Sequence, residues 1–187
     1  MRIVGGTLKG RALVTPGGQA TRPTSDRARE SLFNILAHAD WTTPLDGARA
    51  LDLFAGSGAQ GLEAISRGAS FALFVETDAA ARGAIRDNIE ALSLFGATRI
   101  HRRDATDLGL RPAGLAAPFD VVFLDPPYGK GLGERALTQL LPGGWITPDA
   151  TIVLECAADE TVPTPGFTLR DERIWGAAKV LFLSPAG

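Results

Sequence analysis

From residue 49 onward, short apolar runs alternate with glycine-containing turns and amphipathic segments. Five runs, four of them rich in Leu, Val, Ile and Phe, predict β-strands, and segments with the apolar spacing of helices follow most of them. The expected strands are 50–54, 71–75, 98–102, 120–124 and 152–155. The expected helices run through 62–65, from about 78 to 94, and from about 133 to 141. This alternation predicts an α/β fold in which a mostly parallel sheet carries helices on both faces.

The C-terminal end of the chain departs from this alternation. Residues 168–174 and 179–183 are two β-rich runs around Gly176, and the interval between them has no room for a crossover helix. Strands joined by so short a connection pair in the antiparallel sense. These runs therefore predict a hairpin at the end of the sheet.

The beginning of the chain predicts a short hairpin followed by a helix. Residues 2–4 and 11–14 have strand character and precede the breaker sequence Pro16-Gly17-Gly18. Thr24 or Ser25 can cap the helix that follows, because a hydroxyl accepts a hydrogen bond from a free backbone amide there. The apolar face of this helix is formed by Ala28, Leu32, Ile35, Leu36 and Ala39.

Charge is unevenly distributed along the chain. The 187 residues have a net charge of −2, but residues 1–35 hold six basic side chains against two acidic ones. That segment is therefore at +4 and the remainder at −6. A basic segment on an acidic body indicates contact with a polyanion, although a solvated hairpin and helix would have the same composition. We divide the chain into a basic extension, residues 1–44, and a main domain, residues 45–187.

Composition argues against several classes of protein. With 45% hydrophobic and 21% charged residues and no apolar run near 18 residues, we expect a soluble chain without a membrane span. The N-terminus has no apolar stretch of signal-peptide length, and the single cysteine, Cys156, fits the reducing cytoplasm. Cys156 lies in a strand-like run and should be a packed, unreactive thiol. His38 and His101 lack neighbouring ligands at metal-binding spacing, so no metal is expected.

Three of the predicted strands end in residues that suit a nucleotide-like cofactor, because ligands of open α/β sheets bind at the carboxyl ends of the strands. Gly56-Ser57-Gly58 lets a ligand approach the backbone beside a helix N-terminus. Glu76 can accept both hydroxyls of a ribose, and Asp104 could reach an adenine amino group. The other expected cofactor contacts are Asp52, Phe54, Thr77, Ala105 and Asp125.

The glycine motif alone leaves the identity of the cofactor open. Residues 56–61 have the spacing Gly-x-Gly-x-x-Gly, which also matches an NAD-binding loop. The glycines could equally serve a tight turn, and Glu76 could be solvated. Asp52 favours S-adenosylmethionine, because it lies within the first strand, where it could hold the ammonium of a methionine moiety.

Asp125-Pro126-Pro127-Tyr128 follows the fourth predicted strand directly and is the strongest chemical signal in the chain. An exocyclic amine on a nucleic-acid base is a poor nucleophile, because its lone pair is delocalised into the ring. The Asp125 carboxylate and the Pro126 carbonyl could accept the two amine hydrogens and stabilise the developing positive charge. Pro126 and Pro127 stiffen the loop, and Tyr128 offers a face for an extruded base. The alternative interpretation is a plain Pro-Pro turn.

Together these motifs resemble the RsmD-type methyltransferases, which methylate guanine N2 in bacterial small-subunit (16S) ribosomal RNA. The likeness spans nearly the whole chain. It is carried by residues 2–6, 10–11, 22–36 and 51–58, by Glu76 and by residues 125–128. The segment 22–36 is the most specific of these, whereas Asp-Pro-Pro-Tyr is shared with adenine-N6 methylating enzymes.

The resemblance implies a Rossmann-like class I methyltransferase with a seven-stranded sheet, and S-adenosylmethionine as the cofactor, with S-adenosylhomocysteine as its product. It makes the basic extension an RNA-binding element. The RNA contacts then expected are Arg2, Lys9, Arg11, Arg22, Pro23, Thr24, Arg27 and Arg29. The implied partner is 16S ribosomal RNA in the small subunit or an assembly intermediate, met in the cytoplasm by a monomer. From the residues alone, an adenine-N6 methyltransferase, an NAD-dependent reductase and a non-catalytic RNA-binding module stay open as alternatives.

Overall fold

The structure, a computed structural model, describes residues 1–17 and 25–187, and a single mixed β-sheet forms its centre. Within these ranges the sheet has seven strands in the order β3-β2-β1-β4-β5-β7-β6. The strands are β1 (Arg49–Leu53), β2 (Phe71–Val75), β3 (Thr98–His101), β4 (Phe119–Leu124), β5 (Ile146–Ala157), β6 (Phe167–Trp175) and β7 (Ala178–Pro185). Strands β1 to β5 are parallel, and β7 is antiparallel to β5 and β6. The predicted sheet and its terminal hairpin are confirmed.

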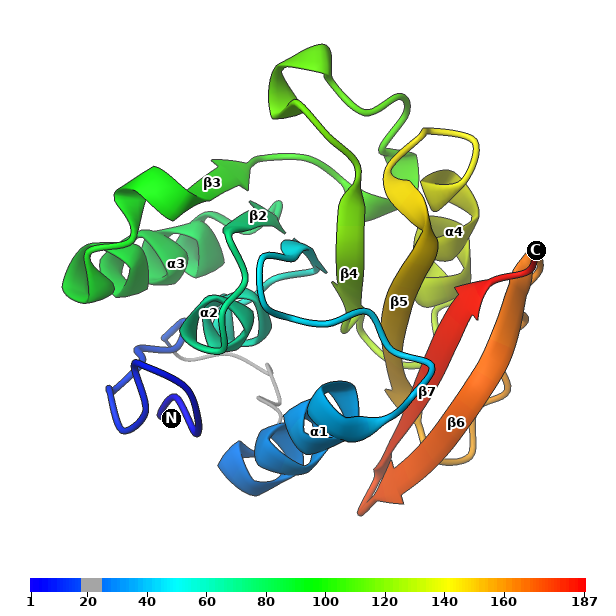
Figure 1. Ribbon diagram of the computed structural model, residues 1–187, viewed down its shortest axis with the longest axis horizontal. Coiled ribbons are helices and arrows are strands. Elements are labelled where there is room, and N and C mark those ends of the chain that lie inside the picture. The colour runs from blue at the N-terminus through cyan, green and yellow to red at the C-terminus, as the bar shows by residue number, and fades with distance from the viewer. Residues whose placement is uncertain (18–24) are drawn as a thin grey trace.

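Helices cover both faces of this sheet (Figure 1). Over the described ranges the α-helices are α1 (Asp26–His38), α2 (Ala59–Ser66), α3 (Ala79–Leu92) and α4 (Leu132–Leu140). Helices α1, α2 and α3 pack on one face and α4 on the other. Ser25 caps α1 by accepting the Ala28 N–H at 3.1 Å, whereas Thr24 lies outside the described residues. None of these helices is long and apolar enough to cross a membrane.

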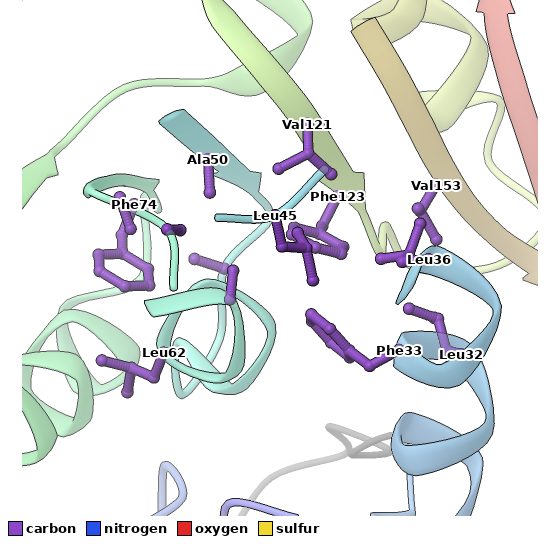
Figure 2. Close-up of a cluster of buried hydrophobic side chains, with 14 of the residues drawn as sticks. Leu32, Phe33, Leu36, Leu45, Ala50, Leu62, Phe74, Val121, Phe123 and Val153 are labelled. Carbon is purple, nitrogen blue, oxygen red and sulfur yellow. The ribbon is translucent and has the colours of Figure 1, made fainter. Parts of the chain in front are cut away.

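The two cores on either side of the sheet take alternate residues of each strand, because successive side chains of a strand point to opposite faces. In β4, Val121 and Phe123 belong to the core beneath α1, α2 and α3, whereas Val122 and Leu124 belong to the core beneath α4. Figure 2 shows the first core, in which the rings of Phe33 and Phe123 lie 5.5 Å apart. A strand buried on both faces is apolar throughout, which explains the continuous hydrophobic runs.

Strand β5 is longer than the sequence predicted, at Ile146–Ala157 instead of 152–155. Its early part contains the exposed Pro148, and its pairing with β4 shifts register between Phe119 and Val121. Exposed irregularities of this kind are among the few places where a strand tolerates proline. The proline therefore concealed the first half of the strand in the sequence pattern.

The predicted N-terminal hairpin is reduced to one antiparallel bridge, between Arg2 and Ala12. Side chains of the helices bind much of the remaining backbone of this segment. Asn88 of α3, for example, accepts the Val14 N–H at 2.8 Å and donates to the Val14 carbonyl at 3.0 Å. The extension also contributes to the core beneath α1, α2 and α3. Its contributing residues are Ile3, Leu13, Leu32, Phe33 and Leu36.

Glu63 of α2 anchors the N-terminal segment through a fully buried carboxylate. It accepts the backbone N–H groups of Val4 and Gly5, each at 3.0 Å. The buried guanidinium of Arg29 on α1 pairs with it, Nε to Oε1, at 3.3 Å and also donates to the Arg2 carbonyl. Two helices and the start of the chain therefore meet at one buried ion pair.

We expect Glu63→Ala to lower the free energy of unfolding by about 3–5 kcal/mol, because it leaves the buried Arg29 without its buried carboxylate partner and the Val4 and Gly5 amides without their acceptor. Urea unfolding monitored by circular dichroism measures this change. The control is Glu30→Ala, which removes an exposed carboxylate of α1 and should change stability by less than about 0.5 kcal/mol. Equal effects of the two substitutions would show that the pair is not an anchor.

Candidate active site

The carboxyl ends of four parallel strands lie in register at one edge of the sheet. Leu53 of β1 is paired with Val75 of β2 and Leu124 of β4, and Leu124 is paired with Leu154 of β5. The residues that come next along the chain therefore follow one aligned row of the sheet. In sheet order they are Glu76, Phe54, Asp125 and Glu155. Only the last of these was not among the site residues predicted from the sequence.

These strand ends border a cavity of about 740 Å³. The predicted residues that line it are Asp52, Phe54, Gly56, Ser57, Glu76, Thr77, Asp104, Asp125, Pro126, Pro127 and Tyr128. Gly58 and Ala105 were also predicted, but over the described part of the chain they are not in the lining. Gly58 is buried beside Phe74, and Ala105 is buried in the core beneath α4. The expected cofactor residues and the expected catalytic residues thus share one space.

The turn after β1 is fixed to the end of β2 by Glu76. Phe54 and Gly56 both have positive φ, 56° and 59°, so the chain reverses sharply here. Such a conformation is ordinary for glycine but strained for phenylalanine, and strain of this kind concentrates at functional sites. Glu76 accepts the Gly56 N–H at 2.8 Å through Oε1 and the Asp78 N–H at 3.0 Å through Oε2. These bonds hold the Glu76 carboxylate at the cavity wall.

Asp52 is a buried carboxyl group in the cavity wall, with 2% of its surface exposed. It accepts the Gly61 N–H at 3.0 Å. Burial, followed by the charge of Glu76, raises the pKa of Asp52 to about 8 against the opposing effect of this hydrogen bond. Gln60, also in the wall, has a buried Oε1 with no hydrogen-bond partner among the described residues. A cationic amine is a suitable donor for either oxygen acceptor, so these residues fit the ammonium of a methionine moiety.

Asp125-Pro126-Pro127-Tyr128 leaves β4 and forms the part of the cavity wall that adjoins β5. The Tyr128 hydroxyl donates a hydrogen bond to Glu155 Oε2 at 2.8 Å, and Glu155 is itself 8% exposed. This bond fixes the direction of the tyrosine ring at the cavity. Glu155 was not expected from the sequence, because it lies in the apolar run 152–156. A carboxylate inside a buried strand is the signal that could have identified it.

Asp104 lies at the end of β3, where it is held by the residue two positions on. Its Oδ1 accepts the Thr106 N–H at 2.8 Å and the Thr106 hydroxyl at 2.7 Å, and these two bonds lower the pKa of Asp104. Arg135 of α4 contributes to the same lowering through its charge. The lining residues that the sequence did not identify are Met1, Thr15, Pro16, Ala55, Ala59, Gln60, Thr106, Leu132, Arg135 and Glu155.

Cys156, His38 and His101 are not among the described residues that line the cavity. Cys156 is 3% exposed, and burial raises the pKa of its thiol to about 11, as expected of a packed, unreactive thiol. His38 Nδ1 lies 2.8 Å from the Asn34 carbonyl oxygen at the exposed end of α1. His101 lies in β3, where burial lowers its pKa.

The basic residues proposed to contact RNA fall into three groups. Arg2, Lys9, Arg11 and Arg27 are exposed, and Arg22, Pro23 and Thr24 lie outside the described residues. Arg29 requires a correction, because its side chain is completely buried. It pairs with Glu63 and Asp26 instead of presenting its charge to solvent. The prediction failed for Arg29 because this residue lies on the buried face of α1, together with Leu32, Phe33 and Leu36.

With β7 inserted antiparallel between β5 and β6, and Asp-Pro-Pro-Tyr at the end of β4, this chain is a class I methyltransferase. The sequence pattern of the family described as "Conserved hypothetical protein 95" matches residues 1–184. "Ribosomal RNA small subunit methyltransferase D" of Escherichia coli strain K12 is 36% identical over 178 residues, which are 94% of this chain and 85% of that relative. The chain belongs to this family, the RsmD-type methyltransferases.

Solved structures agree with this assignment. The Escherichia coli protein yhhF superposes with a TM-score of 0.80 at 37% sequence identity, covering 99% of this chain and 97% of its own. The protein SMU.776, solved in complex with SAH, has a TM-score of 0.67 at 16% identity, covering 88% of this chain and 50% of its own. The second likeness shows a shared fold.

We expect Asp52 to make the ligand-free protein less stable as the pH rises from about 4 to about 8. The folded protein retains the Asp52 proton up to pH about 8, whereas the unfolded chain loses it near its ordinary value of 3.8. The free energy of unfolding therefore falls in this window by up to about 1.4 kcal/mol per pH unit from this group. Asp52→Asn resembles the protonated form, so its free energy of unfolding should lack this pH-dependent decrease.

Urea unfolding of the wild type and of Asp52→Asn at pH 5, 6.5 and 8 measures the difference. The gap between the two proteins should grow in favour of the variant as the pH rises. Asp87→Asn, at an exposed position of α3, is the matched control and should differ from the wild type by the same amount at each pH. A gap that does not change with pH for Asp52→Asn would contradict the raised pKa.

Proposed function

We propose that this enzyme transfers the methyl group of S-adenosylmethionine to the exocyclic N2 amine of a guanine in small-subunit ribosomal RNA. The observation that carries the proposal is the single cavity that joins the cofactor-type strand ends to the Asp-Pro-Pro-Tyr loop. The name of the Escherichia coli relative supports the choice of RNA. The volume of about 740 Å³ lies within the range of cavities that enclose small-molecule ligands.

The residues present fit the cofactor along the whole row of strand ends. Glu76 would accept the ribose hydroxyls, Asp52 and Gln60 would receive the ammonium of the methionine moiety, and Asp104 would lie nearest the adenine amine. When bound, the cofactor supplies a methyl group on a positively charged sulfur. The protein then has to place an amine nitrogen in line with that methyl group, and positioning can supply about 7–11 kcal/mol of the barrier.

The loop after β4 would handle the target amine. The Asp125 carboxylate and the Pro126 carbonyl would accept the two amine hydrogens, which directs the nitrogen lone pair out of conjugation and towards the methyl group. As the carbon–nitrogen bond forms and the carbon–sulfur bond breaks, the amine loses one proton, which the Asp125 carboxylate would receive. Tyr128 would stack on the extruded base, a contact worth about 1–3 kcal/mol.

The N-terminal extension would hold the RNA around the cavity. Met1, Thr15 and Pro16 line the cavity, so the extension and the catalytic loop border the same space. Lys9 and Arg27 are exposed on this extension, where they can meet phosphates. The proposed partner is therefore 16S ribosomal RNA, in the small subunit or an assembly intermediate, met in the cytoplasm by a monomer.

We expect Asp125→Ala to lower methyl transfer to small ribosomal subunits by at least about a hundredfold while cofactor binding is retained, because the other cofactor contacts are at other strand ends. Transfer of a radiolabelled methyl group measures turnover, and calorimetry measures cofactor binding. Asp159→Ala, at an exposed position after β5, is the control and should keep both. Nucleoside digestion identifies the product, and methyladenosine in place of N2-methylguanosine would refute the choice of base.

We also expect Lys9→Ala and Arg27→Ala to weaken RNA binding and to reduce the dependence of affinity on salt. Each lost phosphate contact should decrease the slope of log affinity against log salt by about 1. Filter binding to 16S ribosomal RNA at several salt concentrations measures the slope. Arg170→Ala on β6 removes an exposed arginine outside the extension and should leave the slope unchanged. If all three variants behave alike, the extension is not the RNA-binding element.

A further inference from the structure

Glu155 takes no part in the methyl-transfer steps proposed above, yet it lies beside the Asp-Pro-Pro-Tyr loop. It is the residue after Leu154, whose partner in β4 is Leu124, and Asp125 follows Leu124. The two carboxylates therefore come at the same level of neighbouring strands and line the same cavity. Glu155 is 8% exposed and binds the Tyr128 hydroxyl at 2.8 Å. Burying a carboxylate is costly, and the Tyr128 hydroxyl is one donor that offsets this cost.

The part of the cavity wall formed by the ends of β4 and β5 is rich in hydrogen-bond acceptors. It contains the carboxylates of Asp125 and Glu155, and Pro126 and Pro127 bring carbonyl groups without N–H donors. The edge of guanine that carries N2 presents a second donor, N1–H, directly beside the amine. The corresponding edge of adenine presents a ring nitrogen lone pair beside its amine. A wall of acceptors therefore complements guanine and repels adenine.

We propose that Glu155 is the specificity-determining residue of this site, accepting a hydrogen bond from N1–H of the target guanine while it orients the Tyr128 ring on which that guanine stacks. The inference rests on the proposed guanine-N2 methylation and names the group that selects the base. One carboxylate has two oxygens, so it can bind the tyrosine hydroxyl and a ring N–H together.

The other carboxylates at the strand ends are less suited to this role. Glu76 bonds to the amides of Gly56 and Asp78, and Asp104 bonds to Thr106. Both lie on the side of β1 away from β4, at the ends of β2 and β3. Glu155 is in the strand next to β4, and it accepts the hydroxyl of Tyr128, the tyrosine of the catalytic loop, at 2.8 Å.

The test uses a base that keeps the N2 amine of guanine but has no hydrogen on the adjacent ring nitrogen, N1. 2-Aminopurine has the same N2 amine as guanine, but its N1 is a lone pair. Nucleoside mapping first locates the nucleotide that the wild type methylates. Small subunits are then reconstituted with 16S ribosomal RNA ligated to carry guanine or 2-aminopurine there, and kcat/KM is measured on each. We expect the wild type to prefer guanine by at least about tenfold, because a carboxylate oxygen accepts the N1–H of guanine but is repelled by the N1 lone pair of 2-aminopurine.

Glu155→Gln should decrease that preference by at least about tenfold, because its amide N–H can donate to N1 of 2-aminopurine. Glu160→Gln is the matched control. Glu160 accepts the Gly129 N–H at 3.3 Å, supporting the same loop from outside the large cavity, so its variant should retain the wild-type preference. Tyr128→Phe removes the hydroxyl and leaves the stacking ring, and it should slow the reaction with the preference retained.

Two results would overturn the role of Glu155. One is a Glu155→Gln variant that is slow on both bases with an unchanged preference, which would make the residue a support for Tyr128 alone. The other is the absence of a preference for guanine in the wild type. This measurement does not depend on whether any variant folds. Failure of the proposed function is recognised separately, because the mapped product would then be a base other than N2-methylguanine.

Discussion

The buried pair of Arg29 and Glu63 determines where the start of the chain lies. Two opposite charges removed from water are stable only when their remaining hydrogen-bonding groups are also satisfied. Glu63 meets this requirement by accepting the amides of Val4 and Gly5, and Arg29 meets it by donating to the carbonyl of Arg2. An ion pair completed by the backbone of a third segment fixes that segment in one place. The pair therefore joins α1, α2 and the N-terminal residues into one unit.

The fixed position of the N-terminal segment affects the site, because Met1, Thr15 and Pro16 line the cavity. The uneven distribution of charge in the sequence predicted a basic extension in contact with a polyanion, and the resemblance implied that this polyanion is RNA. In the structure the same extension packs into the core beneath α1, α2 and α3 and also contributes to the lining of the cavity. Exposed side chains such as Lys9 and Arg27 belong to this same extension and can contact phosphates. The N-terminal extension therefore carries both part of the cavity lining and the basic side chains proposed to contact RNA.

The strands and the residues at their ends could be predicted from the sequence, because both depend on local patterns. Asp125 follows an apolar run, and the parallel topology alone brings such residues to one edge of the sheet. The roles of Glu155 and Arg29 could not be predicted in this way. Their partners, Tyr128 and Glu63, are 27 and 34 residues away in the chain, and hydrogen bonds over such distances leave no local pattern. The sequence shows only a carboxylate in a strand and an arginine on a helix.

The distribution of charge suits two ligands of opposite sign. Besides Asp52, which keeps its proton up to pH about 8 in the ligand-free protein, four acidic residues line the described part of the cavity, against two arginines, of which Arg29 is already paired with Glu63. A cofactor with a positively charged sulfur is attracted to such a wall. Once the methyl group has moved, the sulfur is neutral, so this attraction weakens and release of the product is favoured. The same wall repels phosphate. The uncharged base is therefore the part of a nucleotide that can enter the cavity, while the RNA backbone stays with the basic extension outside.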